Sequence, residues 1–201
     1  MVARAATAVV VVLGATTPPS VAASGPPTSS SPGPVDRIRW NIDLADQTEA
    51  TPAFAADVIF VSTHHGKLAA LDAKSGAVRW RGQLDGFGDA VAVANGRMYV
   101  ASGDPMTSEC RLHALDAATG TPRWTRTSRP CAGLTLGVDV AYLATNGVLP
   151  NSGRILEPAR VMALGADTGR QRWSVQIDSP NAELSAPMVA GRTVYVTSSP
   201  S

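Results

Sequence analysis

The chain is poor in charged and aromatic residues and has only two cysteines. Of its 201 residues, 16% are charged and 5% are aromatic, and the formal net charge is +1. A chain so close to neutral has no general attraction to nucleic acid or to an anionic membrane, so we expect neither as a partner. Apolar residues make up 44%, which is enough for a packed core.

The sequence also lacks the short motifs that mark common catalytic sites. It contains no phosphate-binding loop, nucleophile elbow or zinc-binding helix motif. His64 and His65 could ligate a metal, but adjacency is not a ligand spacing, and two solvated side chains in a turn explain them as well. His113 is expected to be a packed core residue. We therefore predict no metal site and assign no catalytic residue.

No apolar run is long enough to span a membrane comfortably, but the first residues are typical of an export signal. Arg4 supplies a positive charge, residues 5–14 are small and apolar, and residues 20–23 offer small side chains to signal peptidase. We predict a signal peptide over residues 1–23, with an uncleaved anchor as the alternative. The mature protein is then secreted or extracytoplasmic, in the cell envelope, without a transmembrane segment.

Residues 24–35 consist almost entirely of proline, serine and glycine with threonine. Such a stretch buries too little apolar surface to offset the entropy of ordering it, which predicts a disordered linker. The folded part is expected over residues 36–201.

A repeat is visible in the tryptophans, which lie 40, 44 and 49 residues apart. Three of the four end near-copies of one phrase: ALDAKSGAVRW, ALDAATGTPRW and ALGADTGRQRW. The shared positions of this phrase are Ala70, Asp72, Gly76, Trp80, Ala114, Asp116, Gly120, Trp124, Ala163, Gly169 and Trp173. A second phrase, upstream of the first, places Phe60, Tyr99, Tyr142 and Tyr195 in one column.

Each phrase has a physical interpretation. The tyrosine segments are short, β-branched and aromatic, which favours buried strands. The glycine of the first phrase permits a positive φ in a tight hairpin turn, and the aspartate can accept hydrogen bonds from turn amides. Four short strands in each period of 40 to 50 residues predict an all-β fold, a β-propeller of four-stranded antiparallel blades. A β-sandwich is the alternative, but it leaves the repeat unexplained.

The phrase Ala-x-Asp-x-x-x-Gly-x-x-x-Trp resembles the tryptophan-docking motif of the pyrroloquinoline-quinone (PQQ)-type repeat propellers. Ser185 to Pro187 and Thr51-Pro52 resemble the opening strand of that family's blade. The resemblance covers residues 36–201, with blades at about 51–84, 89–128 and 134–177 and a partial blade at 185–201. Gly165 stands where the third phrase should have its acid, which predicts a weaker turn there.

The predicted blades do not close a circle. Trp40 is expected on a lone outermost strand, and the last blade has an inner strand at 186–189 and a second strand at 193–198, but no third. Family members typically have seven or eight blades. Two interpretations remain: the sequence is a fragment of a longer chain that holds the missing blades, or the protein pairs with something that closes it.

Cys110 and Cys131 are predicted to form a disulfide, because an exported chain meets an oxidising compartment. Two buried thiols are the alternative. Two longer insertions, Asp104 to Cys110 and Asn146 to Pro158, contain Glu109 and Glu157 and are candidates for a recognition surface, although drift of loop length explains them as well.

Two functions from different classes remain. The first is an exported, non-catalytic propeller that acts as a binding or assembly scaffold for a protein or small-molecule partner, without a cofactor. The second is a fragment of a PQQ-dependent quinoprotein oxidoreductase acting on alcohols or sugars. The resemblance implies that such an enzyme would need a closed barrel, calcium beside the quinone, a catalytic aspartate and commonly an adjacent cysteine pair.

Overall fold

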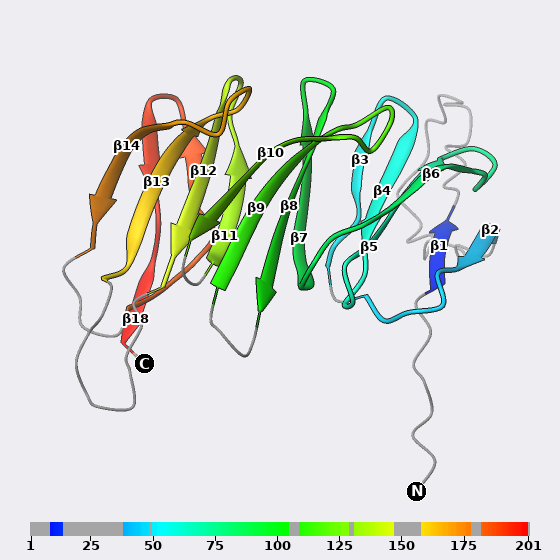
Figure 1. Ribbon diagram of the computed structural model, residues 1–201, viewed down its shortest axis with the longest axis horizontal. Helices are drawn as coiled ribbons and strands as arrows, with labels where there is room; N and C mark the ends of the chain where they lie inside the picture. Colours follow the sequence, from blue (N-terminus) through cyan, green and yellow to red (C-terminus); the bar gives the residue numbers. More distant parts are fainter. Residues whose placement is uncertain are drawn as a thin grey trace, which may run out of the picture.

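The computed structural model describes residues 9–13, 38–48, 50–104, 109–128, 131–146, 158–177 and 182–200. Every regular element in these ranges is a β-strand, and none of the described residues forms a helix that could cross a membrane. The predicted linker, and the predicted signal peptide apart from residues 9–13, lie outside the described residues. Figure 1 shows the sheets standing side by side in a row along the longest axis.

Three four-stranded antiparallel sheets form the body of the molecule, each with its strands in sequence order. We call the strands of a blade A to D in that order. Blade one contains β3 (Ala53–Ala55), β4 (Val58–Ser62), β5 (Lys67–Asp72) and β6 (Val78–Gln83). Blade two contains β7 (Phe87–Ala94), β8 (Arg97–Asp104), β9 (Glu109–Asp116) and β10 (Pro122–Ser128). Blade three contains β11 (Cys131–Leu136), β12 (Val140–Thr145), β13 (Arg160–Gly165) and β14 (Gln171–Gln176). The all-β class with four-stranded antiparallel blades is therefore confirmed.

A hairpin follows blade three and supplies strands A and B of a fourth blade. It contains β15 (Ala182–Leu184), β16 (Met188–Ala190), β17 (Thr193–Tyr195) and β18 (Ser198–Pro200), with β16 paired to β17 and β15 paired to β18. The single strand expected over 193–198 is thus interrupted. The interruption lies opposite Pro187, which has no N–H to donate to the ladder. Beside it, the Ser185 N–H donates to the Thr197 carbonyl at 3.0 Å.

At the other end, Trp40 lies in β2 (Ile38–Asp43), which pairs antiparallel with β1 (Val9–Leu13). The expectation that the Trp40 strand is lone was therefore wrong. The sequence of β1 is VVVVL, and a β-branched run of this kind suits a strand as well as the apolar part of an export signal.

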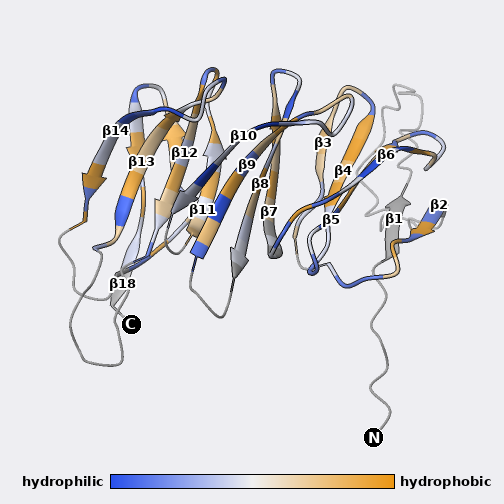
Figure 2. Ribbon diagram, viewed as in Figure 1, coloured by the Kyte–Doolittle hydropathy of each residue, from blue (hydrophilic) through white to orange (hydrophobic). Residues whose placement is uncertain are grey.

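The core lies between the blades rather than in one central mass. One cluster joins blades one and two and includes Phe60, Met98 and Val100, and another joins blades two and three and includes Tyr99 and Leu143. Both faces of the inner strands are buried in this way, which explains their near-continuous apolar sequences. In Figure 2, apolar residues follow the strands and hydrophilic residues gather in the connecting turns.

Candidate functional site

Successive blades are joined by a tryptophan that donates a hydrogen bond to the following unit. The indole N–H of Trp40 donates to the carbonyl of Ala73 at 3.1 Å. The same bond runs from Trp80 to Ala117 at 2.9 Å and from Trp124 to Ala166 at 3.0 Å. Each acceptor is the third residue before the glycine of its phrase. The repeated phrase is therefore the structure that joins one blade to the next.

The glycine of each phrase lies against the face of the docking tryptophan. Gly76, Gly120 and Gly169 have φ of 74°, 73° and 64°. A Cβ atom on them would lie 2.6 to 2.7 Å from the nearest tryptophan ring atom. Glycine is required at this position both for the backbone conformation and for the room.

The aspartate of the phrase holds the turn together. In blade one, Asp72 accepts hydrogen bonds from the backbone N–H groups of Lys74 and Ser75 at 3.1 and 2.9 Å, and its other oxygen pairs with Arg79 at 2.7 Å. The Arg79 guanidinium and these hydrogen bonds hold the pKa of Asp72 well below its usual range. Asp116 and Arg123 form the same ion pair at 2.7 Å in blade two.

In blade three, Gly165 stands in place of this aspartate, and the turn still forms. The Gly169 N–H still donates to the Gly165 carbonyl at 2.8 Å, the distance that the corresponding bonds have in the other two blades. The arginine of the phrase, Arg172, turns instead to Asp139, at 2.8 Å. The turn thus loses the hydrogen bonds of a carboxylate but keeps its backbone bond. A surface pocket of about 300 Å³ opens at this turn and is lined by Asp139, Gly165, Asp167, Thr168, Arg170, Gln171 and Arg172.

The aromatic residue of each strand B lies next to the tryptophan of its own blade. Ring centroids are 6.2 Å apart for Phe60 and Trp80, and 6.0 Å apart for Tyr99 and Trp124. The Tyr99 hydroxyl also reaches the next blade and donates to the Ala166 carbonyl at 3.0 Å. Ala166 therefore accepts two hydrogen bonds from blade two, one from a tyrosine and one from a tryptophan.

Blade three repeats this aromatic pair in Tyr142 and Trp173. Tyr142 and Trp173 have ring centroids 6.0 Å apart, and among the described residues neither the Tyr142 hydroxyl nor the Trp173 indole N–H has a hydrogen-bond acceptor. Trp173 is 39% exposed, and Tyr195 of the fourth blade is 51% exposed, whereas Tyr99 is 1% exposed. Val175 on β14 and Met188 on β16 are also exposed, at 53% and 63%. We call Tyr142, Trp173, Val175, Met188 and Tyr195 the open end.

The histidine pair lies beside a buried carboxylate that the sequence did not single out. Asp46 accepts from the Thr63 hydroxyl at 2.7 Å and lies 2.6 Å from Nδ1 of His65, whose side chain is 66% exposed. Burial alone would raise the pKa of Asp46, but the hydrogen bonds from His65, Thr63 and the Gln47 N–H together hold it well below its usual range. The described residues hold no group of three or more His, Cys, Asp or Glu side chains that could bind a metal.

His113 is a packed core residue, as expected. Its Nε2 lies 3.0 Å from the Ser102 hydroxyl and its Nδ1 lies 3.1 Å from that of Thr125. Burial lowers the pKa of His113, and Arg111 lowers it further. Because Ser102 is 2% exposed and His113 9% exposed, this serine–histidine contact is closed to a substrate.

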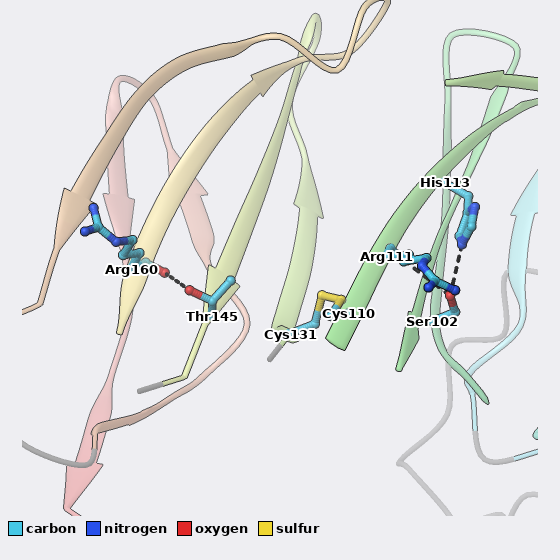
Figure 3. The surroundings of a disulfide bond; sticks show 7 residues. All are labelled: Ser102, Cys110, Arg111, His113, Cys131, Thr145 and Arg160. Atoms are coloured by element: carbon cyan, nitrogen blue, oxygen red, sulfur yellow. Dashed lines mark hydrogen bonds between the residues drawn. A yellow bond between two sulfur atoms is a disulfide. The ribbon is translucent and has the colours of Figure 1, made fainter. Parts of the chain in front are cut away.

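The predicted disulfide between Cys110 and Cys131 is present, with a Cα–Cα distance of 5.4 Å. Cys110 lies in strand C of blade two, and Cys131 is the first residue of strand A of blade three. The bond therefore links two blades and not two segments of one blade (Figure 3). Of the two predicted recognition loops, residues 105–108 and 147–157 lie outside the described residues. Glu109 opens β9 and contacts Arg111 at 3.4 Å.

The family model described as outer membrane protein assembly factor BamB matches residues 33–201. The chain therefore belongs to this family of PQQ-like repeat propellers, and the resemblance seen in the sequence is confirmed. The match includes all three docking phrases and the half-blade at the C-terminal end.

Curated relatives are dehydrogenases that use a quinone. The chain is 30% identical over 160 residues to the dehydrogenase subunit of a quinone alcohol dehydrogenase from Gluconobacter oxydans, covering 68% of this chain and 20% of that protein. It is 30% identical over 153 residues to quinohemoprotein alcohol dehydrogenase ADH IIB from Pseudomonas putida, covering 68% of this chain and 21% of that protein. The chain thus spans about a fifth of the length of these relatives.

Among solved structures, a europium-containing methanol dehydrogenase is similar with a TM-score of 0.58. The identity is 19%, and the similarity covers 73% of this chain and 38% of that one. It supports the propeller fold.

Proposed function

We propose that the protein is an exported, non-catalytic propeller that acts as a scaffold for binding or assembly in the cell envelope. The observation that carries the proposal is the exposure of aromatic side chains at the open end: Trp173 is 39% exposed and Tyr195 is 51% exposed, whereas Tyr99, which corresponds to Tyr195 in blade two, is 1% exposed. Exposed aromatic side chains are typical of protein interaction surfaces.

The polar residues of the repeat support this interpretation. The docking aspartates Asp72 and Asp116 are engaged by turn amides and arginines, and the docking tryptophans Trp40, Trp80 and Trp124 by carbonyls. These groups serve the rigidity of the blades. Export is supported by the sequence of residues 1–23 and by the disulfide, which is stable in an oxidising compartment.

Site-specific photocrosslinking tests the scaffold. A photoreactive residue at Tyr195 should give a discrete crosslinked protein in the envelope of the native host. The same residue at Phe54, which is 65% exposed on β3 of blade one, is the control. Equal products at both positions, or none at Tyr195, would count against the scaffold.

A second candidate is part of a quinoprotein alcohol dehydrogenase, because the curated relatives are enzymes of that kind. The scaffold is favoured over this candidate because the described residues hold no group of three or more His, Cys, Asp or Glu side chains that could bind a metal, and because the two cysteines are 21 positions apart and bonded between blades. Titration with PQQ and calcium, followed by dye reduction with alcohols, distinguishes the candidates. Saturable binding with turnover would overturn the scaffold.

A further inference from the structure

We propose that the turn between β13 and β14 of blade three binds the carboxylate group of a ligand, which takes the place of the aspartate side chain that the other two turns contain. The site consists of Asp167, Thr168 and Arg172 around Gly165, in the surface pocket of about 300 Å³. The inference is independent of the scaffold function, because it rests on this turn and not on the open end.

In blades one and two, the turn supplies a constant set of donors to the carboxylate of the phrase. One oxygen of Asp72 accepts from the backbone N–H groups of Lys74 and Ser75 and from the Ser75 hydroxyl, at 2.9 to 3.1 Å. Asp116 accepts from the same three groups of its own turn, at 3.1 to 3.2 Å. The other oxygen pairs with the arginine of the phrase, at 2.7 Å in both blades. Each turn therefore holds one carboxylate.

Blade three has the same donors but no aspartate. The Thr168 N–H donates instead to the Gly165 carbonyl, at 3.2 Å. Among the described residues, neither the Asp167 N–H nor the Thr168 hydroxyl donates to an acceptor. A Cβ on Gly165 would lie 3.1 Å from Oγ1 of Thr168 and 3.7 Å from Nε of Arg172. The space in which an aspartate side chain would lie is thus next to donors that can bind a carboxylate from elsewhere.

The charges around the pocket also favour an anion. Arg172 is paired with Asp139 at 2.8 Å, and Asp167 is paired with Arg97 at 2.7 Å. Arg170 lines the same pocket and has no ion-pair partner in the part of the chain that the structure describes. The two acids are therefore neutralised and one positive charge is left over, which attracts a negatively charged group.

A neighbouring blade does not close this position. With blade two in place, the side chains of Asp72 and Arg79 remain 27% and 44% exposed. With blade three in place, those of Asp116 and Arg123 remain 23% and 57% exposed. The equivalent place in blade three is therefore accessible to a ligand whether or not a further blade packs against it.

The same carboxylate group can come from a small organic acid or from an acidic side chain of a protein. Three probes distinguish these sources: acetate, succinate, and a tripeptide of glycine, aspartate and glycine with blocked ends. Tighter binding of succinate than of the peptide would assign the site to a small acid whose second carboxylate is near Arg170. The reverse order would assign it to an acidic protein segment.

Amide chemical shifts of the isotope-labelled 201-residue chain measure the binding. We expect sodium acetate to shift the amide signals of Asp167 and Thr168 saturably. Sodium chloride at the same ionic strength is the control and should give smaller shifts without saturation, because it only screens the surface charges.

Variants of the chain locate the site. Gly165 is not among the glycines with positive φ, so Gly165→Asp can supply the missing carboxylate in cis. It should reduce the effect of acetate to that of chloride and raise the Tm. Arg172→Gln should weaken acetate binding roughly two- to fivefold, as expected for an exposed ion pair. Arg123→Gln, which changes the same position of the phrase in blade two, is the matched control and should leave the binding unchanged.

The proposal is overturned if acetate shifts these amides no more than chloride does, or if Gly165→Asp binds acetate as the parent does. It is also overturned if Arg172→Gln and Arg123→Gln change the binding equally. Thermal unfolding shows whether each variant is folded. If Gly165→Asp does not fold, the comparison of Arg172→Gln with Arg123→Gln decides.

Discussion

Single residues decide how closely two blades can approach, and the docking glycines show this most directly. Gly120 and Gly96 have nearly the same backbone conformation, with φ of 73° and 71°. They differ in what surrounds them. A Cβ on Gly120 would meet the Trp80 ring at 2.7 Å, whereas a Cβ on Gly96 would meet nothing within 4 Å.

Gly120→Ala should therefore lower the free energy of unfolding by roughly 2–4 kcal/mol, the sum of a positive-φ penalty and an overpacked junction. Gly96→Ala is the matched control and should cost only about 1 kcal/mol, from the backbone conformation alone. Urea unfolding of both variants measures the difference. Equal losses would show that the contact with Trp80 does not constrain the turn.

His113 gives a prediction on pH. Burial holds its pKa in the folded protein below the usual value of about 6.5. The unfolded chain therefore binds the proton first, and the stability contributed by neutral His113 falls as the pH drops below about 6.5. We expect His113→Met to reduce this loss, because Met162 occupies the equivalent position of blade three. The check is the difference in unfolding free energy between pH 7 and pH 5 for both proteins; an unchanged difference would contradict it.

At the scale of elements, the blades are separate sheets, so the contacts between them govern whether they act as one body. The junction of blades two and three contains several kinds of contact. It combines the Trp124 and Tyr99 hydrogen bonds, an ion pair between Arg97 and Asp167 at 2.7 Å, and the disulfide.

Removing the disulfide with Cys110→Ala and Cys131→Ala together should lower stability by roughly 3 kcal/mol, because the closed loop no longer restricts the unfolded chain. Hydrogen exchange should increase most in β11, whose first residue is the anchored cysteine. The unmodified protein under reducing conditions serves as the control and should behave like the double variant. A double variant as stable as the oxidised parent would contradict the prediction.

At the scale of the molecule, the described strands form an open row of blades with unlike ends (Figure 1). One end carries the half-blade of β15 to β18, and the other carries β1 and β2. Removal of residues 1–23 would change this second end, because β1 lies within these residues and is the strand that pairs with β2. If residues 1–23 are removed, β2 would keep the Trp40 hydrogen bond to Ala73 and the packing of Trp40 and Ile42 against the cluster of Leu44, Val61, Ala69 and Leu71.

We expect the protein from its native host to begin near Ser24, since residues 1–23 have the order of charge, apolar run and small residues of an export signal. Intact-mass measurement of the exported protein checks this directly. Protein recovered in soluble form with Met1 retained would contradict it.

The sequence by itself determined the repeat, the docking turns and the four-stranded pattern of the three blades. The docking phrase recurs with its glycine and tryptophan at constant offsets, and local chemistry at those offsets is enough to predict a hairpin. It also indicated the Cys110–Cys131 bond, which the oxidising compartment of an exported chain favours. What it did not show was that this bond crosses from one blade to the next, because strand A of blade three begins three residues earlier than expected.

Only the tertiary structure decided the contacts between residues that do not occupy matching positions of the repeated phrases. Asp46 and His65 are 19 positions apart and Arg172 and Asp139 are 33 apart, and neither pair lies within a repeated phrase. The same holds for the open end, where Trp173 has the sequence context of Trp80 and Trp124 but a different exposure. Local sequence sets the strand and its turn, while burial depends on what the next unit places against it.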